Sequence, residues 1–227
     1  MSDPDYTSLL SSTLQDLLPA GVHRSACRIP EEPSFEFEVE EQTMCTAGDY
    51  RKREFVAGRG CARSALAQAG FSRAAILPDE YGVPVWPEDA LAAISHSRGY
   101  CAAIACRSAD YRALGLDLEK TNRLSASAIA RTVHPNEQGY VRNDQKRASL
   151  IFCAKEAFFK AQFPLWHTHG NFHDLEFAVD EKTGLLTIQN ISVRFPEDLR
   201  ALSSKIRFRF SYFNDFVVSV CWLARSD

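Results

Sequence analysis

The chain has 227 residues, of which 45% are hydrophobic and 24% are charged, a composition that suits a folded protein with a sizeable core and excludes a disordered one. Its 26 Lys and Arg residues against 29 Asp and Glu residues give a net charge of −3, which argues against general nucleic-acid binding but leaves room for a local basic patch. The N-terminal stretch lacks the basic start and apolar core of a signal peptide, and no apolar run is long enough to cross a membrane. We therefore expect a cytoplasmic protein without a membrane partner.

The cysteine pattern also indicates a cytoplasmic protein. The chain holds seven cysteines, an odd number that suits a disulfide framework poorly, and none of them forms a C-x-x-C pair. We interpret them as reduced, mostly buried thiols, and we expect no zinc site.

In the first half of the chain, the hydrophobic spacing and the turn residues define most elements. Gly58 and Gly60 each lower helix stability by about 1 kcal/mol relative to Ala, within a stretch that otherwise has a helical period. Arg98-Gly99 marks a tight turn between two strands. The expected elements are a helix at 5–18, a strand at 35–39, a helix at 49–69, a loop at 77–89, a strand at 92–97 and a buried strand at 100–106.

The second half repeats the pattern of strands and helices. It contains a helical stretch that Pro135 breaks, a strongly apolar helix, and strands that turns at 182–184 and 214–215 separate. The expected elements are a strand at 113–119, helices at 125–146 and 147–163, and strands at 175–179, 185–193, 206–213 and 216–224. Strand and helix groups thus recur about once in each half, which predicts the α+β class.

Two carboxylates, Asp117 and Glu119, lie two positions apart among leucines in the strand expected at 113–119. Side chains alternate faces in a strand, so the leucines point one way and both acids point the other, about 7 Å apart. One interpretation is an edge strand with a solvated face. The other is a site for a hard cation such as Mg²⁺, which binds carboxylates, waters and substrate phosphates. Asp-x-Glu alone leaves both interpretations open.

The apolar helix at 147–163 carries Lys155, Glu156 and Lys160, although it offers no proper solvent face for them. As an exposed pair, Glu156 and Lys160 would contribute only about 0.2–0.5 kcal/mol. Burying such charges costs several kcal/mol each unless they are paired or bound to a metal or substrate. A functional role is therefore favoured, with Glu156 as the third carboxylate of a magnesium site.

Ser95 and His96 precede the turn at Arg98-Gly99 and the buried strand. A single histidine is more often structural. Beside Arg59, Arg63 and Arg98, however, it could bind phosphate oxygens.

Five blocks of this sequence resemble the 4′-phosphopantetheinyl transferases, specifically the larger monomeric kind. The blocks keep their order and spacing between about Arg51 and Phe177, and the last two are the most specific. They are GRGCARSAL (58–66), DEYGVPVWP (79–87), ISHSRGY (94–100), GLDLEKT (115–121) and FCAKEAFFK (152–160). The resemblance implies two similar α+β halves related by a pseudo-two-fold, at residues 1–112 and 113–227, with coenzyme A between them and the metal site in the second half.

The resemblance also implies roles for single residues. Asp117, Glu119 and Glu156 would hold Mg²⁺ against the coenzyme A pyrophosphate, and Lys160 would contact the same phosphates. Ser95 and His96 would bind the 3′-phosphate, and Arg59 and the loop at 80–84 would lie beside the nucleotide. Lys155 would contact either a phosphate or only the surface. Some relatives carry Lys where this chain has Val83, so that a phosphate or base contact is either absent here or supplied by Arg59 or Arg63.

The implied reaction transfers the 4′-phosphopantetheine arm of coenzyme A to a serine of an apo acyl or peptidyl carrier protein and releases adenosine 3′,5′-bisphosphate. Glu156 is the first candidate for the base, directly or through a metal-bound water, and Glu137 is the second. Arg51 and Arg53 are candidate contacts for an acidic carrier protein. We expect a monomer that binds no nucleic acid. The alternatives are a Mg²⁺-dependent nucleotide pyrophosphate hydrolase and a non-catalytic module that binds coenzyme A or carrier proteins.

Overall fold

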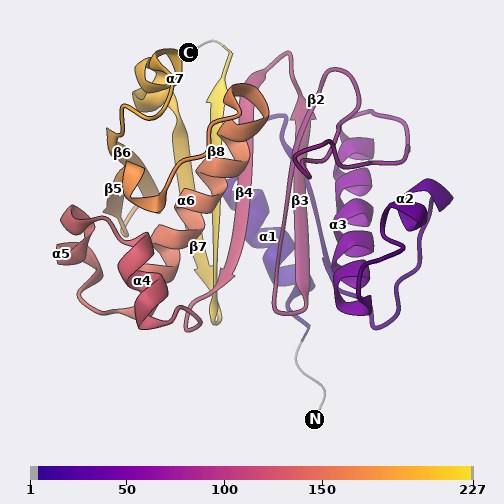
Figure 1. Cartoon of the computed structure of the whole chain (residues 1–227), viewed down its shortest axis with the longest axis horizontal. Coiled ribbons are helices and arrows are strands. Elements are labelled where there is room, and N and C mark those ends of the chain that lie inside the picture. Colours follow the sequence, from indigo (N-terminus) through magenta and orange to yellow (C-terminus); the bar gives the residue numbers. More distant parts are fainter. Residues whose placement is uncertain (1–4, 226–227) are drawn as a thin grey trace. The chain divides into compact units, whose positions relative to one another are not determined.

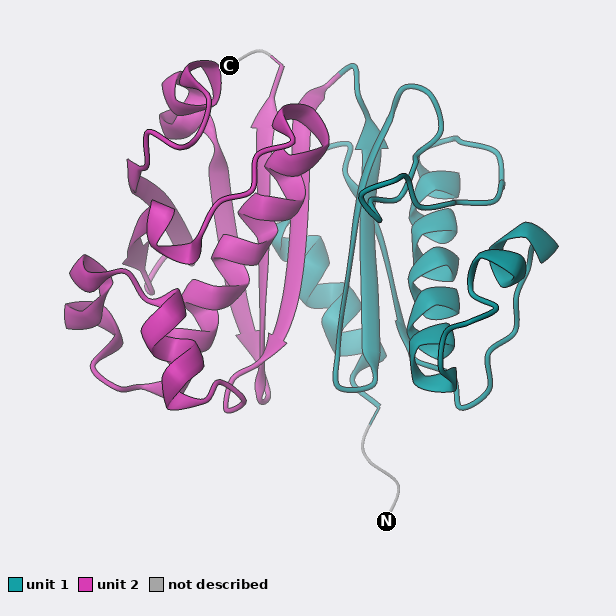
Figure 2. Ribbon diagram, viewed as in Figure 1, with its two compact units in different colours: residues 1–109 teal, residues 110–227 magenta. Residues whose placement is uncertain are grey.

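The computed structural model describes residues 5–225, and the chain divides into two units, residues 1–109 and 110–227 (Figure 2). The division falls between two consecutive strands, β3 and β4, three residues before the boundary predicted after residue 112. Both units combine helices with an antiparallel sheet, so the predicted α+β class is confirmed. The pseudo-two-fold relation between the halves stays a prediction.

The first unit is a three-stranded antiparallel sheet, ordered β1-β3-β2, with helix α3 packed against it. Its elements are α1 (Thr7–Leu17), β1 (His23–Arg28), α2 (Glu38–Thr43), α3 (Asp49–Gln68), β2 (Ala90–Ser97) and β3 (Tyr100–Arg107). Helix α3 continues through Gly58 and Gly60, and small buried residues such as Ala62 and Ala65 face the alanines and cysteines of β3. Small side chains on both surfaces let the helix lie close to the sheet.

The predicted strand at 35–39 is wrong. The alternating phenylalanines that suggested it contact helix α3 instead, because Phe35 lies beside the ring of Phe55 and Phe37 lies under the guanidinium of Arg63. The following residues form α2, whose first turn is rich in glutamate, as the positive end of a helix favours. Strand β1 occupies 23–28, where no clear pattern predicted a strand, and it pairs with β3 along its whole length.

The second unit is a five-stranded antiparallel sheet, ordered β4-β8-β7-β6-β5, with the long helix α6 along one face (Figure 1). The strands are β4 (Tyr111–Lys120), β5 (Leu175–Asp180), β6 (Leu185–Ile191), β7 (Arg207–Phe213) and β8 (Phe216–Ala224). The helices are α4 (Ala126–Thr132), α5 (Gln138–Val141), α6 (Gln145–Trp166) and α7 (Glu197–Leu202), with short 3₁₀ turns at 135–137, 172–174 and 203–205. Helix α7 was not predicted.

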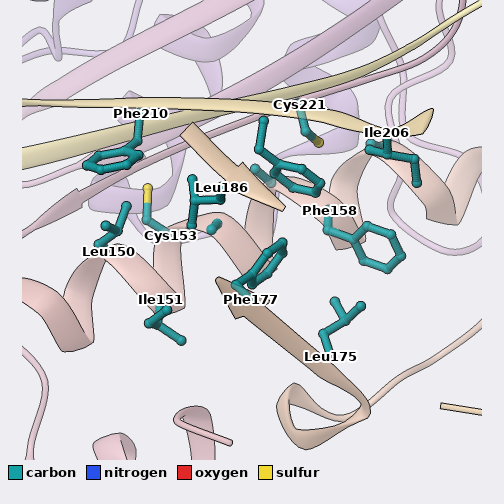
Figure 3. Close-up of a cluster of buried hydrophobic side chains, with 14 of the residues drawn as sticks. Leu150, Ile151, Cys153, Phe158, Leu175, Phe177, Leu186, Ile206, Phe210 and Cys221 are labelled. Atoms are coloured by element: carbon teal, nitrogen blue, oxygen red, sulfur yellow. The ribbon is translucent and has the colours of Figure 1, made fainter. Parts of the chain in front are cut away.

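Helix α6 begins where Asp144 accepts hydrogen bonds from the backbone N–H groups of Lys146 and Arg147. Its apolar surface packs on the strands, and the resulting core includes Phe158 from the helix, Phe177 from β5 and Phe210 from β7 (Figure 3). The prediction that this helix is buried on most sides is confirmed. Helix α6 and strand β4, which carry all three predicted metal ligands, are packed together in this unit.

Two further features bear on the predictions. All seven cysteines are free thiols, and five of them are buried whereas Cys45 is exposed. The prediction of reduced, mostly buried thiols is therefore confirmed. Among residues 5–225, none of the helices combines the length and the apolar character that crossing a membrane requires.

Candidate active site

The two predicted carboxylates of β4 point away from water. Only 5% of Asp117 and 7% of Glu119 are exposed, and Leu116 and Leu118 on the opposite face are also buried. Strand β4 is an edge of its sheet, but neither face is solvated, so the interpretation of Asp117 and Glu119 as ordinary surface acids is excluded. Buried carboxylates need a partner of opposite charge or a bound cation.

Gly115 lets helix α6 approach the face of β4 that carries these acids. A Cβ atom at this position would lie 2.1 Å from the backbone oxygen of Ala157 and 2.9 Å from both the Cβ of Ala161 and the Sγ of Cys221. No residue other than glycine fits without moving the helix, which is the usual reason for a glycine inside a strand. One step along the same face, the Nζ of Lys160 donates to Oδ1 of Asp117 at 2.6 Å.

Glu156 lies one helical turn before Lys160 and is electrostatically coupled to both acids of β4. Burial raises its pKa, and the negative charges of Asp117 and Glu119 raise it further, although Lys160 opposes them. Burial lowers the pKa of Lys160, but the carboxylates, above all Asp117, outweigh this and raise it overall. The structure thus brings three carboxylates and one ammonium group into mutual electrostatic reach.

The carboxylate oxygens suit a hard cation such as Mg²⁺, and their mutual repulsion is what a divalent ion would relieve. In the described part of the chain, however, no three acidic, histidine or cysteine side chains are already arranged to hold a metal ion. Two of the acids already form ion pairs with basic side chains. Lys160 pairs with Asp117, and Arg123 donates to Oε1 of Glu119 at 3.0 Å. A metal ion would have to displace these cations, at least in part.

Glu137 was predicted as a candidate base and Lys155 as a candidate phosphate contact, but the two side chains contact each other and not the candidate site. The Nζ of Lys155 donates to Oε2 of Glu137 at 2.7 Å and to the backbone oxygen of Thr132 at 2.9 Å, and Lys155 is fully buried. Glu137 also accepts from the backbone N–H groups of His134 and Phe177. The pair therefore ties α6 to β5 and to the 3₁₀ turn at 135–137. A base or a phosphate contact needs an accessible group, so the geometry supports a structural role for both residues.

Arg59 and Arg63 are also buried, with 7% and 4% exposed. The Nε of Arg59 donates to the backbone oxygen of Ile76 at 2.7 Å, and its guanidinium stacks on Phe55. Arg63 forms ion pairs with Glu40 at 2.6 Å and with Glu36 at 2.9 Å. These contacts attach α2 and the segments beside it to α3, so the predicted nucleotide contacts of both arginines are not supported by the geometry.

Ser95 and His96 lie near the end of β2, where Ser95 is buried and the side chain of His96 is one-third exposed. The Nδ1 of His96 lies 3.0 Å from Oε1 of Glu54, and its Nε2 lies 3.3 Å from Nη1 of Arg51. Arg51 in turn contacts Glu54 at 3.3 Å. The histidine is thus oriented by a carboxylate and stands beside an exposed arginine, an arrangement suited to an anion.

Comparisons with known proteins show the family of this chain. The model of the 4′-phosphopantetheinyl transferase N-terminal domain matches residues 39–106, and the model of the 4′-phosphopantetheinyl transferase superfamily matches residues 113–221. The chain is 32% identical to the 4′-phosphopantetheinyl transferase Npt of Nocardia iowensis, over 75% of this chain and 78% of that protein. The chain belongs to the 4′-phosphopantetheinyl transferase superfamily.

A second sequence relative also fits the superfamily, and solved structures show a weaker likeness. The 4′-phosphopantetheinyl transferase Svp of Streptomyces mobaraensis is 33% identical over 70% of this chain and 67% of that protein. A crystal structure of holo-ACP-synthase from Plasmodium yoelii superposes with a TM-score of 0.40 and 18% identity, over 52% of this chain and 97% of that one. Membership of the phosphopantetheinyl transferase superfamily, predicted from the motifs, is confirmed by the sequence relatives.

The sequence alone did not identify three residues of the candidate site of this phosphopantetheinyl transferase. Arg123 follows Glu119 by four positions in a loop, Glu54 lies on α3 one turn after Arg51, and Gly115 interrupts a strand of leucines. Only Gly115 carried a usable signal, because a glycine inside a strand often marks a close backbone approach.

Proposed function

We propose that the chain transfers the 4′-phosphopantetheine arm of coenzyme A to a serine of an apo carrier protein and releases adenosine 3′,5′-bisphosphate. Membership of the superfamily supports this reaction. The observation that carries the assignment of the residues is the close packing of β4 on α6 at Gly115, which gathers Asp117, Glu119, Glu156 and Lys160.

In this proposal Asp117, Glu119 and Glu156 would hold Mg²⁺, which would neutralise the charge of the coenzyme A diphosphate. Lys160 turns from Asp117 to the phosphate oxygens and stabilises the charge that grows on the leaving group. Its raised pKa keeps it protonated for this task at neutral pH.

Glu156 accepts the proton of the carrier serine, directly or through a water molecule. Without a metal ion, burial and the charges of Asp117 and Glu119 raise its pKa, whereas a bound cation would oppose this shift and favour the ionised carboxylate that a base requires. Glu137, the second candidate, has no accessible oxygen for the task, and we assign it to the support of α6 together with Lys155.

For the 3′-phosphate of coenzyme A we propose Ser95 and His96, with Arg51 as a neighbouring cation. Glu54 fixes the ring of His96, and a protonated ring would form ion pairs with Glu54 and with a bound phosphate. The exposed Arg51 is also available for the acidic surface of a carrier protein. We further propose a monomer, since both family models match the same chain.

The test is incubation of the chain with coenzyme A, Mg²⁺ and a panel of apo acyl and peptidyl carrier proteins, followed by mass spectrometry of the carrier. A carrier that gains one phosphopantetheine arm supports the proposal. Breakdown of coenzyme A without any carrier would favour a pyrophosphate hydrolase. Binding without turnover on any carrier would favour a non-catalytic module.

A further inference from the structure

Outside the candidate active site, the first unit contains a cluster of three thiols. Cys27 lies on β1, Cys61 on α3 and Cys101 on β3, and Cys27 and Cys101 are paired in the register of the sheet. The Sγ atoms of Cys61 and Cys27 are 3.3 Å apart, and Cys61 donates to Cys27. The proposed transfer reaction uses none of these three thiols.

The three thiols differ in accessibility. Cys61 and Cys101 are buried, with 2% and 0% exposed, whereas Cys27 is only partly buried. A reagent from solution therefore reaches Cys27 first. Hydrogen bonds from Cys101 and then from Cys61 also lower the pKa of the Cys27 thiol, which favours the nucleophilic thiolate.

We propose that Cys27 and Cys61 form a redox-active dithiol that reacts with low-molecular-weight disulfides. The sulfur of Cys27 attacks one sulfur of the small disulfide, releases the first small thiol and forms a mixed disulfide. The sulfur of Cys61, after losing its proton to water, attacks the sulfur of Cys27 and releases the second small thiol. Two protein thiols are oxidised to one disulfide, and one small disulfide is reduced to two thiols.

The geometry suits a disulfide between Cys27 and Cys61. A covalent S–S bond is about 2.05 Å long, so the two sulfurs must approach by only about 1.2 Å. The bond would join α3 to β1, two elements already packed together, across a chain segment of more than thirty residues. Closing a loop of that length should raise the thermal midpoint by several degrees.

The test treats the full chain with glutathione disulfide and maps disulfides by mass spectrometry after proteolysis. Cys45 is exposed and will react on its own, so the experiment is run in the wild type and in Cys45→Ser. We expect both proteins to lose two hydrogen atoms in a Cys27–Cys61 linkage, with a higher thermal midpoint that dithiothreitol reverses. Oxidation confined to Cys45, or a linkage of Cys27 to Cys101, would overturn the proposal.

Two variants separate a resolving role for Cys61 from simple proximity. In Cys61→Ala, which keeps Cys101, the reaction should stop at glutathione bound to Cys27 if Cys61 is the thiol that releases it. Cys101→Ala, a matched change in the same cluster, should still form the Cys27–Cys61 linkage. If Cys61→Ala instead forms a protein disulfide at the wild-type rate, the assigned pair is wrong. The result does not depend on the transfer activity, since neither coenzyme A nor a carrier protein is present.

Discussion

Replacing Gly115 by Ala tests whether the contact between β4 and α6 builds the candidate site. The added methyl carbon would lie 2.1 Å from the backbone oxygen of Ala157, whereas ordinary contact begins at about 3.4 Å, so the helix must retreat by roughly 1.3 Å. The methyl group would also lie 2.9 Å from Ala161 and Cys221, so a small sideways shift of the strand would not relieve the overlap. Because the methyl group meets backbone and packed side chains, we expect a loss near the upper end of the usual overpacking cost, about 3 kcal/mol.

The same displacement moves Lys160 and Glu156 away from Asp117. A misplacement of about 1 Å can lower an enzymatic rate by roughly a hundredfold, so Gly115→Ala should lose about that factor in transfer to the carrier while remaining folded. Urea unfolding measures the free energy of unfolding, and mass spectrometry of the carrier measures the rate.

Gly139→Ala is the matched control in the same unit, because a Cβ there has no neighbour within 4 Å. It lies in α5, where Ala is neutral or stabilising by up to about 1 kcal/mol. If Gly115→Ala unfolded at the same urea concentration as the wild type and transferred at the same rate, the packing argument would be refuted.

Three further predictions concern charges. Lys155→Met leaves a buried carboxylate at Glu137 without its partner and should lower the free energy of unfolding by about 3–5 kcal/mol, measured in urea; a loss below about 1 kcal/mol would contradict the structural role. Arg123→Gln removes the cation that competes for Glu119 and should tighten Mn²⁺ binding about two- to fivefold by calorimetry, whereas weaker binding would show that Arg123 does not compete. His96→Ala should raise the KM for coenzyme A about tenfold but change the KM for 3′-dephospho-coenzyme A much less, and equal effects on both substrates would remove its role at the 3′-phosphate.

Local sequence signals predicted most of the fold correctly. The turns at 182–184 and 214–215 separate strands that the structure confirms, because Gly184 and Asn214 adopt the positive φ angles that such turns require. The failure at 35–39 has a tertiary cause, since the phenylalanines that alternate there pack on α3 rather than on a sheet. Alternation shows that a chain segment has an apolar side, but it does not show what covers that side.

The sequence predicted where the charged site residues lie on their strand and helix, but it did not predict their partners. The face of Asp117 and Glu119 followed from strand periodicity alone, and the helical period correctly gave the buried character of α6. The partners of the buried charges did not follow, because Glu137 lies 18 positions before Lys155 and Glu40 lies 23 positions before Arg63. Only the folded chain brings such groups together, so the sequence could not distinguish a buried structural ion pair from a phosphate contact.

Binding of Mn²⁺ in the presence of coenzyme A, followed by electron paramagnetic resonance, tests the shared carboxylate site most directly. The wild type should bind one ion, and Asp117→Asn and Glu156→Gln should each weaken its binding at least tenfold, although the two acids come from different elements. Glu197→Gln, on the separate helix α7, should leave binding unchanged. Wild-type affinity for Mn²⁺ in the Glu156→Gln variant would contradict the claim that β4 and α6 hold a single ion.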